Sequence, residues 1–350
     1  MHNSLLMKVS IAIVTFNSAA VIKDCLTSVE KIDYDNFEIL IYDNASIDNT
    51  IEIIESFGNK RIKIVRSYYN RGFGFGLNRL AEISTGEILA SLNPDTVVDK
   101  EWIKNAVKHF VSEDVGMVSS RILFKDNPDL IDSAGHLLYP DGINRGRGHK
   151  QRVCDAFLKT TDVAFPSGSA GFYRRELFLK FGGIDESFFL FGDDTDIGIK
   201  FQLNGYRCIY EPDSIVYHIY SHSTGKYSDI KAYFVERNRV RILLKYFPTR
   251  LIGWSALYTL KRAFYHNLSA IIGKGDTANY LKNGSIFRLY TLMLMAYLDT
   301  ILNLQNILRT RKEISKKIRN RKIGQLLQRF PISAREIALN DYSKGVDHDI

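Results

Sequence analysis

Three carboxylates lie within four residues, at Asp193, Asp194 and Asp196, and only Gly192 separates them from a phenylalanine-rich run at 188–191. Like charges at this spacing repel one another, and neighbouring aromatic side chains raise the cost of ionising each acid. Such a cluster is typical of a site that needs a carboxylate base or a place for a cation. A helix N-terminus explains one aspartate, because its side chain satisfies free N–H groups and suits the helix dipole. Three aspartates this close together favour a functional role.

The chain before this cluster alternates between strand-like and helix-like patterns. Apolar, β-branched runs predict strands at 8–15, 37–42, 61–65 and 87–92. Apolar residues at helical spacing predict helices at 18–30, 49–57, 75–83 and 102–111, with Ser18 and Asp48 as the N-caps of the first two. This alternation predicts an α/β fold with a parallel, doubly wound sheet, whose ligands bind at the carboxyl ends of the strands.

Small or polar residues lie at or beyond the end of each predicted strand. They are Thr15 and Asn17 for the first strand, Asp43, Asn44, Ser46 and Asp48 for the second, Asn70, Gly72 and Asn78 for the third, and Asn93 and Asp95 for the fourth. Turn chemistry explains any one of these clusters, and it explains Asn44, Ser46 and Asp48 at least as well as ligand binding does. Four clusters at one edge of a parallel sheet together predict a binding site.

Three alternating glycines, Gly72, Gly74 and Gly76, follow the third predicted strand. A dinucleotide fingerprint has a different spacing and follows the first strand, so a dehydrogenase is rejected. Glycines here let the backbone approach a ligand, or let the next helix pack close to the sheet.

The order and spacing of these motifs resemble the family 2 glycosyltransferases, and within them the rhamnosyltransferase-like branch. The residues that carry the resemblance are Val14-Thr15-Phe16-Asn17, Asp43-Asn44-Ala45-Ser46 with Asp48, Asn70 with Gly72, Asn93-Pro94-Asp95, and the run from Gly183 through Asp185, Phe188 and Phe189 to Asp193, Asp194 and Asp196. The resemblance covers residues 9–245. It implies a GT-A fold, with a Rossmann-like mixed sheet, in residues 1–248, and a helical C-terminal region follows at 249–350.

The resemblance also implies which residues hold the donor. Asp43 would accept the N3–H of a uracil or thymine ring, with Thr15 and Asn17 nearby on the nucleoside or the diphosphate. The other donor-binding residues that it implies are Asn44, Asn70, Gly72, Asn78, Asn93 and Ser169. Ser169 belongs to the segment 166–171, which is explained equally well as a turn or as the lining of the sugar pocket.

A divalent cation, Mg²⁺ or Mn²⁺, is implied at Asp95. Asn93-Pro94-Asp95 stands where the family has its Asp-x-Asp metal motif, and Asn93 replaces the first acid. One or two carboxylates with phosphates and waters are often enough for Mg²⁺. His218 matches a family position that supplies another metal ligand or contacts the leaving diphosphate. A single histidine near a strand is more often structural, so this role depends on the resemblance.

The acidic cluster then receives a role in catalysis. The resemblance implies that Asp194 is the general base in a single displacement with inversion, and that Asp193 occupies a position more often held by Glu. Asp193 is the alternative base and a possible helix cap, and Asp196 is expected to support the turn. The sequence leaves the choice between Asp193 and Asp194 open.

Charge and cysteine content indicate the compartment and the kinds of partner to expect. Three cysteines that are far apart in the sequence, without any Cys-x-x-Cys pair, fit a reducing cytosol, and residues 1–8 show no secretory signal. The net charge is +8, and the segment 309–322 holds eight Lys and Arg residues against one Glu. Such a segment binds nucleic acid or an anionic membrane surface, or forms a solvated helix face.

Two apolar stretches, 251–272 and 286–308, lie in the helix-rich C-terminal region. Both contain charged residues, and neither is a convincing membrane span. Helices that pack into a core are the favoured interpretation, and amphipathic helices lying in a membrane surface are the alternative.

The resemblance implies an inverting glycosyltransferase, and the basic segment with the apolar stretches predicts that it acts at the cytoplasmic side of the inner membrane. The expected donor is dTDP-L-rhamnose, the expected acceptor is a polysaccharide or a polyprenyl-linked glycan, and no nucleic acid partner is expected. A nucleotidyltransferase is the nearest alternative, but it needs a glycine-rich loop with a basic residue where this chain has Asn17-Ser18-Ala19-Ala20. A non-catalytic binding protein with its basic segment on nucleic acid is disfavoured by the acids at 95, 193, 194 and 196.

Overall fold

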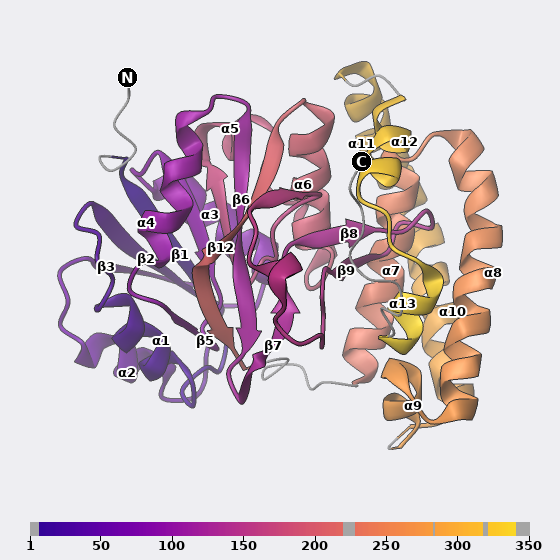
Figure 1. Cartoon of the computed structure of the whole chain (residues 1–350), viewed down its shortest axis with the longest axis horizontal. Helices are drawn as coiled ribbons and strands as arrows, with labels where there is room; N and C mark the ends of the chain where they lie inside the picture. The colour runs from indigo at the N-terminus through magenta and orange to yellow at the C-terminus, as the bar shows by residue number, and fades with distance from the viewer. Residues whose placement is uncertain (1–6, 220–227, 283, 318–320, 341–350) are drawn as a thin grey trace. The chain divides into compact units, whose positions relative to one another are not determined.

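A computed structural model describes residues 7–219, 228–282, 284–317 and 321–340, and it divides the chain into two compact units (Figure 1). Unit 1 holds the residues up to 136 and from 146 to 223, and unit 2 holds residues 137–145 and those from 224 onward. Helix α7 (Asp229–Tyr246) therefore belongs to unit 2, where it packs on α10 (Ile286–Leu302) and α11 (Leu304–Lys317). The domain boundary expected at 248 concerns the extent of the family domain and stays a prediction.

Unit 1 is built on a ten-stranded mixed sheet in the order β10-β12-β6-β11-β4-β1-β2-β3, with β5 paired to β12 and β7 to β6. The strands are β1 (Val9–Thr15), β2 (Phe37–Asp43), β3 (Ile62–Arg66), β4 (Ile88–Leu92), β5 (Thr96–Val98), β6 (Val115–Phe124), β7 (Asn127–Ser133), β10 (Thr161–Val163), β11 (Ala170–Arg174) and β12 (Arg207–His218). The helices are α1 (Ile22–Val29), α2 (Thr50–Ser56), α3 (Phe73–Ile83), α4 (Trp102–Val107), α5 (Arg175–Lys180) and α6 (Asp193–Leu203).

The predicted alternation of strands and helices is confirmed in the first half of the sheet. Strand β1 runs parallel to β2 and β4, and β2 runs parallel to β3. Strands β1, β2 and β4 are buried along their whole length, which explains their nearly continuous apolar sequences. The sheet is not wholly parallel, because β11 inserts antiparallel between β4 and β6. This mixed sheet agrees with the GT-A fold.

The predicted N-caps of the first two helices, Ser18 and Asp48, are wrong. The first helix begins at Ile22, and Ser18 contributes its carbonyl, which accepts from the N–H groups of Val21 and Ile22 at 3.0 and 2.9 Å. The second helix begins at Thr50, whose N–H donates to Asp48 at 3.1 Å. In both places the polar residue organises the loop before the helix instead of occupying the N-cap position itself.

Unit 2 consists of helices and part of a short hairpin. The hairpin strands are β8 (His136–Leu138) and β9 (Asn144–Gly146), and the helices besides α7, α10 and α11 are α8 (Thr249–Ile272), α9 (Gly275–Leu281), α12 (Arg321–Arg329) and α13 (Ala334–Leu339). Helix α13 packs on α8, and Tyr139 of the hairpin joins Ile332 and Ile337 in a small apolar cluster. Within the described residues no single helix is long and apolar enough to cross a membrane. Helices α9 and α10 reach that length and apolar content only when taken together, and the pair is bent by 112°.

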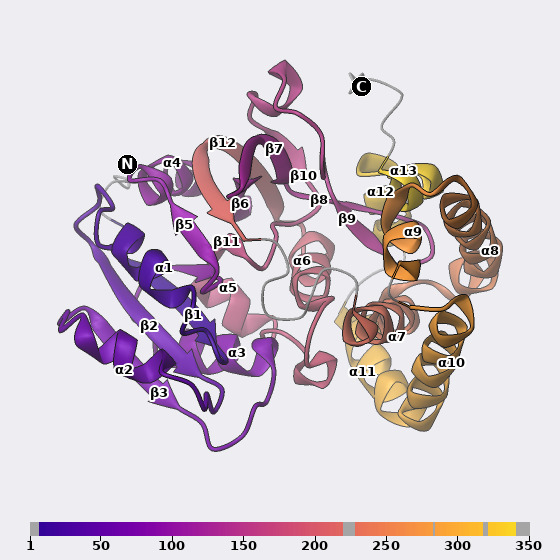
Figure 2. The same ribbon diagram turned by 90° about the horizontal axis from the view of Figure 1, so that it is seen from below.

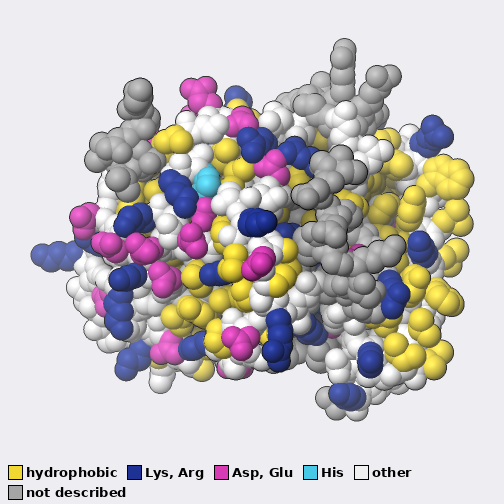
Figure 3. All heavy atoms as spheres, viewed as in Figure 1, with side chains coloured by type: hydrophobic (Ala, Val, Ile, Leu, Met, Phe, Trp, Pro, Cys, Tyr) yellow, Lys and Arg dark blue, Asp and Glu magenta, His cyan; other side chains and the backbone are white. Residues whose placement is uncertain are grey.

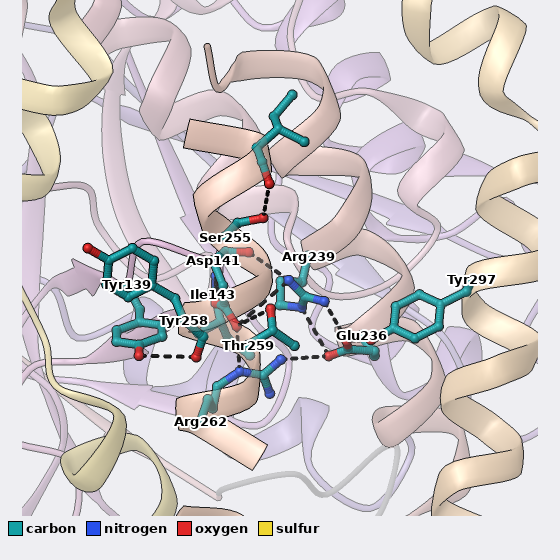
Figure 4. A network of polar contacts seen from close by, with 11 residues as sticks. Tyr139, Asp141, Ile143, Glu236, Arg239, Ser255, Tyr258, Thr259, Arg262 and Tyr297 are labelled. Carbon is teal, nitrogen blue, oxygen red and sulfur yellow. Dashed lines mark hydrogen bonds and ion pairs between the residues drawn. The ribbon is translucent and has the colours of Figure 1, made fainter. Parts of the chain in front are cut away.

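A network of buried charges holds unit 2 together (Figure 4). Arg262 donates to Asp141 at 2.7 Å and to Glu236 at 3.1 Å. Arg239 forms two hydrogen bonds with Glu236, at 2.6 and 3.0 Å, and a third with the carbonyl of Asp141 at 2.7 Å. Tyr297 donates to Glu236 at 2.7 Å. Two guanidinium groups and two carboxylates thus neutralise one another, and the network ties the hairpin to α7, α8 and α10.

The core-packing interpretation of the apolar stretch 251–272 is wrong. The buried residues of α8 are Ser255, Arg262 and Ser269, whereas Trp254 and Phe264 are more than half exposed. Periodicity in a sequence identifies the apolar side of a helix but not what lies against it. In α8 the polar side faces inward because Arg262 belongs to the buried charge network.

Candidate active site

The acidic cluster follows a strained turn. The N–H of Leu190 donates to the carbonyl of Phe188 at 2.8 Å, which closes a γ-turn around Phe189 with φ of 65° and ψ of −58°. Phe191 also has a positive φ, of 62°. Such conformations cost a non-glycine residue about 1–3 kcal/mol each and are concentrated at functional sites. Helix α6 begins just beyond this turn, at Asp193.

Glycines at the start of α3 let this helix pack against the turn. A Cβ on Gly72 would collide with the carbonyl oxygen of Phe189, and Gly72 has a φ of 85°. A Cβ on Gly74 would lie 3.1 Å from Oδ1 of Asp193, and one on Gly76 would lie 2.8 Å from a side chain of β1. Close helix packing, one of the two roles predicted for these glycines, is therefore confirmed.

The neighbouring aspartates Asp193 and Asp194 have different surroundings. Asp193 is buried, and its Oδ1 has no hydrogen-bond donor among the described residues. Burial and the adjacent charge of Asp194 raise the pKa of Asp193 to about 8. The side chain of Asp194 is 19% exposed, its Oδ1 accepts from the N–H of Thr195 at 2.7 Å, and its Oδ2 lies 3.8 Å from Nδ1 of His136. An accessible carboxylate that accepts an N–H bond suits a general base better than a buried one, so the geometry favours Asp194.

Asp196 anchors the turn from inside. It is fully buried, accepts from the N–H of Asp185 at 3.0 Å and pairs with Lys200 at 2.8 Å. These contacts agree with the supporting role expected for Asp196.

The ends of β1 and β2 are joined through the carboxylate of Asp43. Thr15 Oγ1 donates to Oδ1 of Asp43 at 3.1 Å, and Ser46 donates through its hydroxyl at 2.5 Å and its N–H at 3.1 Å. A carboxylate has about four lone-pair sites. Three donors therefore leave Asp43 able to accept one more, as recognition of an imide N–H requires.

Four of the predicted donor-binding residues use their side-chain amides to hold main-chain groups. The partners are the N–H of Ile47 for Asn17, the N–H of Arg71 and the carbonyl of Gly72 for Asn44, the N–H of Gly72 for Asn70, and both main-chain groups of Ile184 for Asn78. Asn78 thus joins α3 to the segment before the acidic cluster. These contacts indicate that the four amides shape the loops, and direct contact with a donor stays a prediction.

A serine-rich turn connects the end of β4 with the acidic cluster. The N–H of Asn93 donates to the carbonyl of Ser169 at 2.9 Å, and the hydroxyls of Ser167 and Ser169 lie 2.9 Å apart. Gly168 lies beside Asp194, since a Cβ on Gly168 would be 3.9 Å from the Cβ of Asp194. The polar strand end and the acidic cluster are therefore neighbours in unit 1.

Asp95 and His218 come together from the loop after β4 and the end of β12. Oδ1 of Asp95 lies 3.4 Å from Nε2 of His218, and Oδ2 of Asp132 lies 2.7 Å from its Nδ1. Burial lowers the pKa of His218, but the hydrogen bond to Asp132 and the charge of Asp95 outweigh it and raise the pKa to about 10. The contacts with His218 and His149 likewise outweigh burial and hold the pKa of Asp132 well below its usual range. A positive charge is thus favoured between these carboxylates.

Comparisons with known proteins identify the core of this sheet. Residues 10–182 match the family model described as Glycosyl transferase family 2. The chain carries a family 2 glycosyltransferase domain. A mannosyltransferase from Pyrobaculum calidifontis, PcManGT, whose structure holds GDP-Man and Mn²⁺, has a similar fold, with a TM-score of 0.55 and 20% sequence identity over 87% of this chain and 86% of that protein.

Two curated relatives are named for O-antigen biosynthesis and for a glucosyltransferase reaction. The O-antigen biosynthesis protein RfbC of Myxococcus xanthus is 28% identical over 50% of this chain and 14% of its own length. An Escherichia coli β-1,3-glucosyltransferase, WfgD, named for UDP-Glc and α-D-GlcNAc-diphosphoundecaprenol, is 31% identical over 30% of this chain and 40% of its own length. The chain thus matches less than half of the length of each of these relatives.

In the glycosyltransferase domain, Asp95 and His218 fit a divalent cation. Oδ1 of Asp95 is buried without a hydrogen-bond donor in the part of the chain that the structure describes, and it faces Nε2 of His218. No group of three or more His, Cys, Asp or Glu residues that could hold a metal occurs among the described residues, so phosphates and waters would complete the ligand shell. Asp132 on the opposite nitrogen supplies the carboxylate–histidine arrangement that orients a metal-ligating imidazole.

Sequence patterns alone do not single out Asp132, His136 or His149. All three come from the segment 121–150, for which the sequence predicts only a loop-rich excursion with short strands. Asp132 pairs with His149 at 3.1 Å, and His136 stacks on Phe165 with its Nδ1 buried and directed at Asp194. The available signal is the frequency of His and Asp in this segment of the glycosyltransferase domain.

Proposed function

We propose that the chain transfers a sugar from a nucleoside-diphosphate donor to a hydroxyl group of a polysaccharide or lipid-linked glycan, with inversion. One observation carries this proposal. The accessible carboxylate of Asp194 and the Asp95–His218 pair are connected through the serine turn 167–169 at the strand ends of a family 2 glycosyltransferase domain. The names of RfbC and WfgD support a glycan or lipid-linked acceptor.

In the proposed reaction Asp194 accepts the proton of the acceptor hydroxyl while that oxygen attacks the anomeric carbon. The bond between this carbon and the diphosphate oxygen breaks, and the nucleoside diphosphate leaves from the opposite face of the sugar. Holding the two reactants in line contributes several kcal/mol. The buried Asp193, whose pKa is raised by burial and by the charge of Asp194, lies beside the base.

The donor is proposed to bind through its base at Asp43 and through its diphosphate near Asp95. The open acceptor site of Asp43 suits the N3–H of uracil or thymine, and dTDP-L-rhamnose is the donor that we propose. Mg²⁺ or Mn²⁺ held by Asp95 and His218 would neutralise charge on the diphosphate when bound. The presence of Mn²⁺ in the PcManGT structure supports a divalent cation.

The protein is proposed to act in the cytoplasm, on the inner face of the membrane, with the basic segment 309–322 on anionic lipid. The side chains of 315–322 lie outside the described residues. Arg311 donates to the carbonyls of Leu244 and Phe247, both at 2.7 Å, so it is committed to unit 2. Arg309 and Lys312 are exposed, and reversing both charges should weaken flotation with anionic vesicles; unchanged flotation would contradict this role.

The activity is tested by incubating the protein with a panel of nucleotide sugars, a lipid-linked or polysaccharide acceptor and Mg²⁺ or Mn²⁺. Release of a nucleoside diphosphate that needs the acceptor is expected, and it should be largest with dTDP-L-rhamnose. Release of pyrophosphate would indicate a nucleotidyltransferase instead. Asp194→Asn is the inactive control for the expected reaction.

A further inference from the structure

Helices α8 and α10 of unit 2 expose an unusual amount of apolar surface. Of the twenty-four large hydrophobic side chains that are exposed among the described residues, fifteen lie on these two helices. The α8–α10 apolar face is defined here by Trp254, Leu257 and Phe264 on α8 and Phe287, Leu294 and Leu298 on α10. All six side chains are more than half exposed, and Phe287 is 80% exposed. Single exposed hydrophobic residues are normal, but a gathering of this size marks an interaction surface.

The two helices present this surface together. They lie next to each other in two perpendicular views (Figures 1 and 2), and Tyr290 of α10 donates to Asn267 of α8 at 3.1 Å. Apolar side chains gather along the flank of α8 in the space-filling view (Figure 3). The surface is therefore continuous across two helices.

The polarity of α8 is inverted relative to a helix on the surface of a protein in water. Its inner side carries Ser255, Arg262 and Ser269, and Arg262 is held by Asp141 and Glu236. Its outer side carries the apolar residues. A helix with this arrangement is suited to an apolar medium on its outer side, because the apolar side chains there are more stable out of water.

The charges that α8 and α10 leave without an ion pair among the described residues are positive. Helix α8 contains no acidic residue, and its exposed Arg250 and Lys261 have no ion pair among the described residues. The acid of α10 is Asp299, which Arg237 and Arg241 neutralise at 3.3 and 3.1 Å. Long basic side chains beside an apolar surface can bury their stems and direct their charges to anionic headgroups.

A second copy of the chain fits this surface less well. A two-fold interface places the same patch on both sides, so Arg250 and Lys261 of two copies would meet without a carboxylate from α8 to pair with them. Burying unpaired like charges opposes such an interface. A surface of anionic lipid supplies both the apolar medium and the opposite charge.

We propose that the α8–α10 apolar face docks on an anionic lipid surface, with both helices lying in the plane of the interface. Neither helix is long and apolar enough to cross a membrane by itself, which agrees with an in-plane position. This surface is distinct from the basic segment 309–322. The proposal does not depend on the glycosyltransferase activity.

The chain contains a built-in probe for the test. Of its two tryptophans, Trp102 is fully buried and Trp254 lies on the proposed face. Adding vesicles of phosphatidylcholine with phosphatidylglycerol should shift the emission of Trp254 to the blue, and Trp254→Phe should abolish the shift. The full-length protein should also float with these vesicles.

The double variant Phe264→Gln with Phe287→Gln should partition into the vesicles at least about tenfold more weakly, because two apolar side chains are lost from the contact. The matched control, Val111→Gln with Leu158→Gln, changes two apolar residues of unit 1 that are also more than half exposed, and it should float like the parent protein. Thermal unfolding verifies that both variants are folded. Unshifted Trp254 emission, or equal flotation of the two double variants, would overturn the proposal. A dimer that the first double variant dissociates without loss of flotation would overturn it in favour of self-association.

Discussion

Both units of the chain bury charged side chains, but only the charge network of unit 2 is complete. In unit 2 each carboxylate oxygen of Glu236 accepts a hydrogen bond, and the paired guanidinium groups of Arg239 and Arg262 balance Glu236 and Asp141. In unit 1 the buried oxygens Oδ1 of Asp95 and Oδ1 of Asp193 have no donor among the described residues. A complete cluster stabilises a fold, whereas an incomplete one has a place for something that is still to bind.

The difference extends to the directions of the pKa shifts. Burial opposes ionisation of Glu236, but Arg239 and Arg262 outweigh it and hold its pKa well below the usual range. Burial and Asp194 raise the pKa of Asp193 to about 8. In unit 2 the buried carboxylate of Glu236 is thus stabilised in its charged form, whereas in unit 1 the buried carboxylate of Asp193 is costly to ionise.

The largest effect is expected from Asp194→Asn, which removes the proposed base from the incomplete cluster. Sugar transfer should fall roughly 10²–10⁴-fold while thermal stability changes little, because the amide keeps the shape of the carboxylate. Initial rates of nucleoside diphosphate release measure the effect.

The matched variants for this prediction are Asp193→Asn and Asp126→Asn. Asp193→Asn should keep activity within roughly tenfold, and the exposed Asp126→Asn should leave it unchanged. If Asp193→Asn were inactive and Asp194→Asn active, the roles of the two aspartates would be reversed.

The opposite outcome is expected for Arg262→Met, which breaks the complete cluster of unit 2. Removing one guanidinium leaves buried carboxylate charge uncompensated, and such losses cost about 3–5 kcal/mol. Denaturant unfolding measures the loss, and the exposed Arg250→Met is the control. A change below about 1 kcal/mol would show that the network contributes less than a buried ion pair normally does.

A smaller effect is expected from Asp132→Asn, which weakens the support of His218. Loss of a carboxylate that orients a metal-ligating histidine reduces metal affinity roughly 10–100-fold. Calorimetric titration with Mn²⁺ in the presence of the nucleoside diphosphate measures it. Asp129→Asn, which changes an exposed aspartate of the same strand, should leave the affinity unchanged, and an equal loss in both variants would refute the role of Asp132.

The smallest effect concerns the dependence of stability on pH, with opposite signs in the two clusters. The lowered pKa of Glu236 gives stability that is present above about pH 4.5 and is lost as the pH falls further. The raised pKa of Asp193 gives stability that is full below about pH 3.8 and is lost as the pH rises through about 8. A plot of the free energy of unfolding against pH should therefore become flatter at the acid end in Glu236→Gln and at the alkaline end in Asp193→Asn. If Glu236→Gln kept the slope of the parent protein at acid pH, or Asp193→Asn kept it at alkaline pH, the pKa shift given for that residue would be contradicted.

The sequence predicts the local parts of the site because local chemistry determines them. The continuous apolar runs of β1, β2 and β4 identify buried strands, and the polar residues after them, such as Asp43 and Asp95, mark the strand ends at which ligand binding is predicted. The antiparallel insertion of β11 is not visible in the sequence, since it depends on which strands meet far apart along the chain.

The same limit applies to the partners of the site. The role of Asp132 depends on a contact with His218, 86 residues further along the chain. Asn44 and Asn78 are both predicted to bind the donor. Their side-chain amides donate to the carbonyls of Gly72 and Ile184, which no local pattern in the sequence reveals.

What the sequence by itself determined is the order of the strand ends, the acidic cluster and the family to which the domain belongs. What only the tertiary structure decided is which buried charges are satisfied and which are not, and which side of α8 faces inward. The physical reason is that residue type and periodicity fix what a side chain can do locally. Its burial and its partners are set by segments brought together from distant parts of the chain.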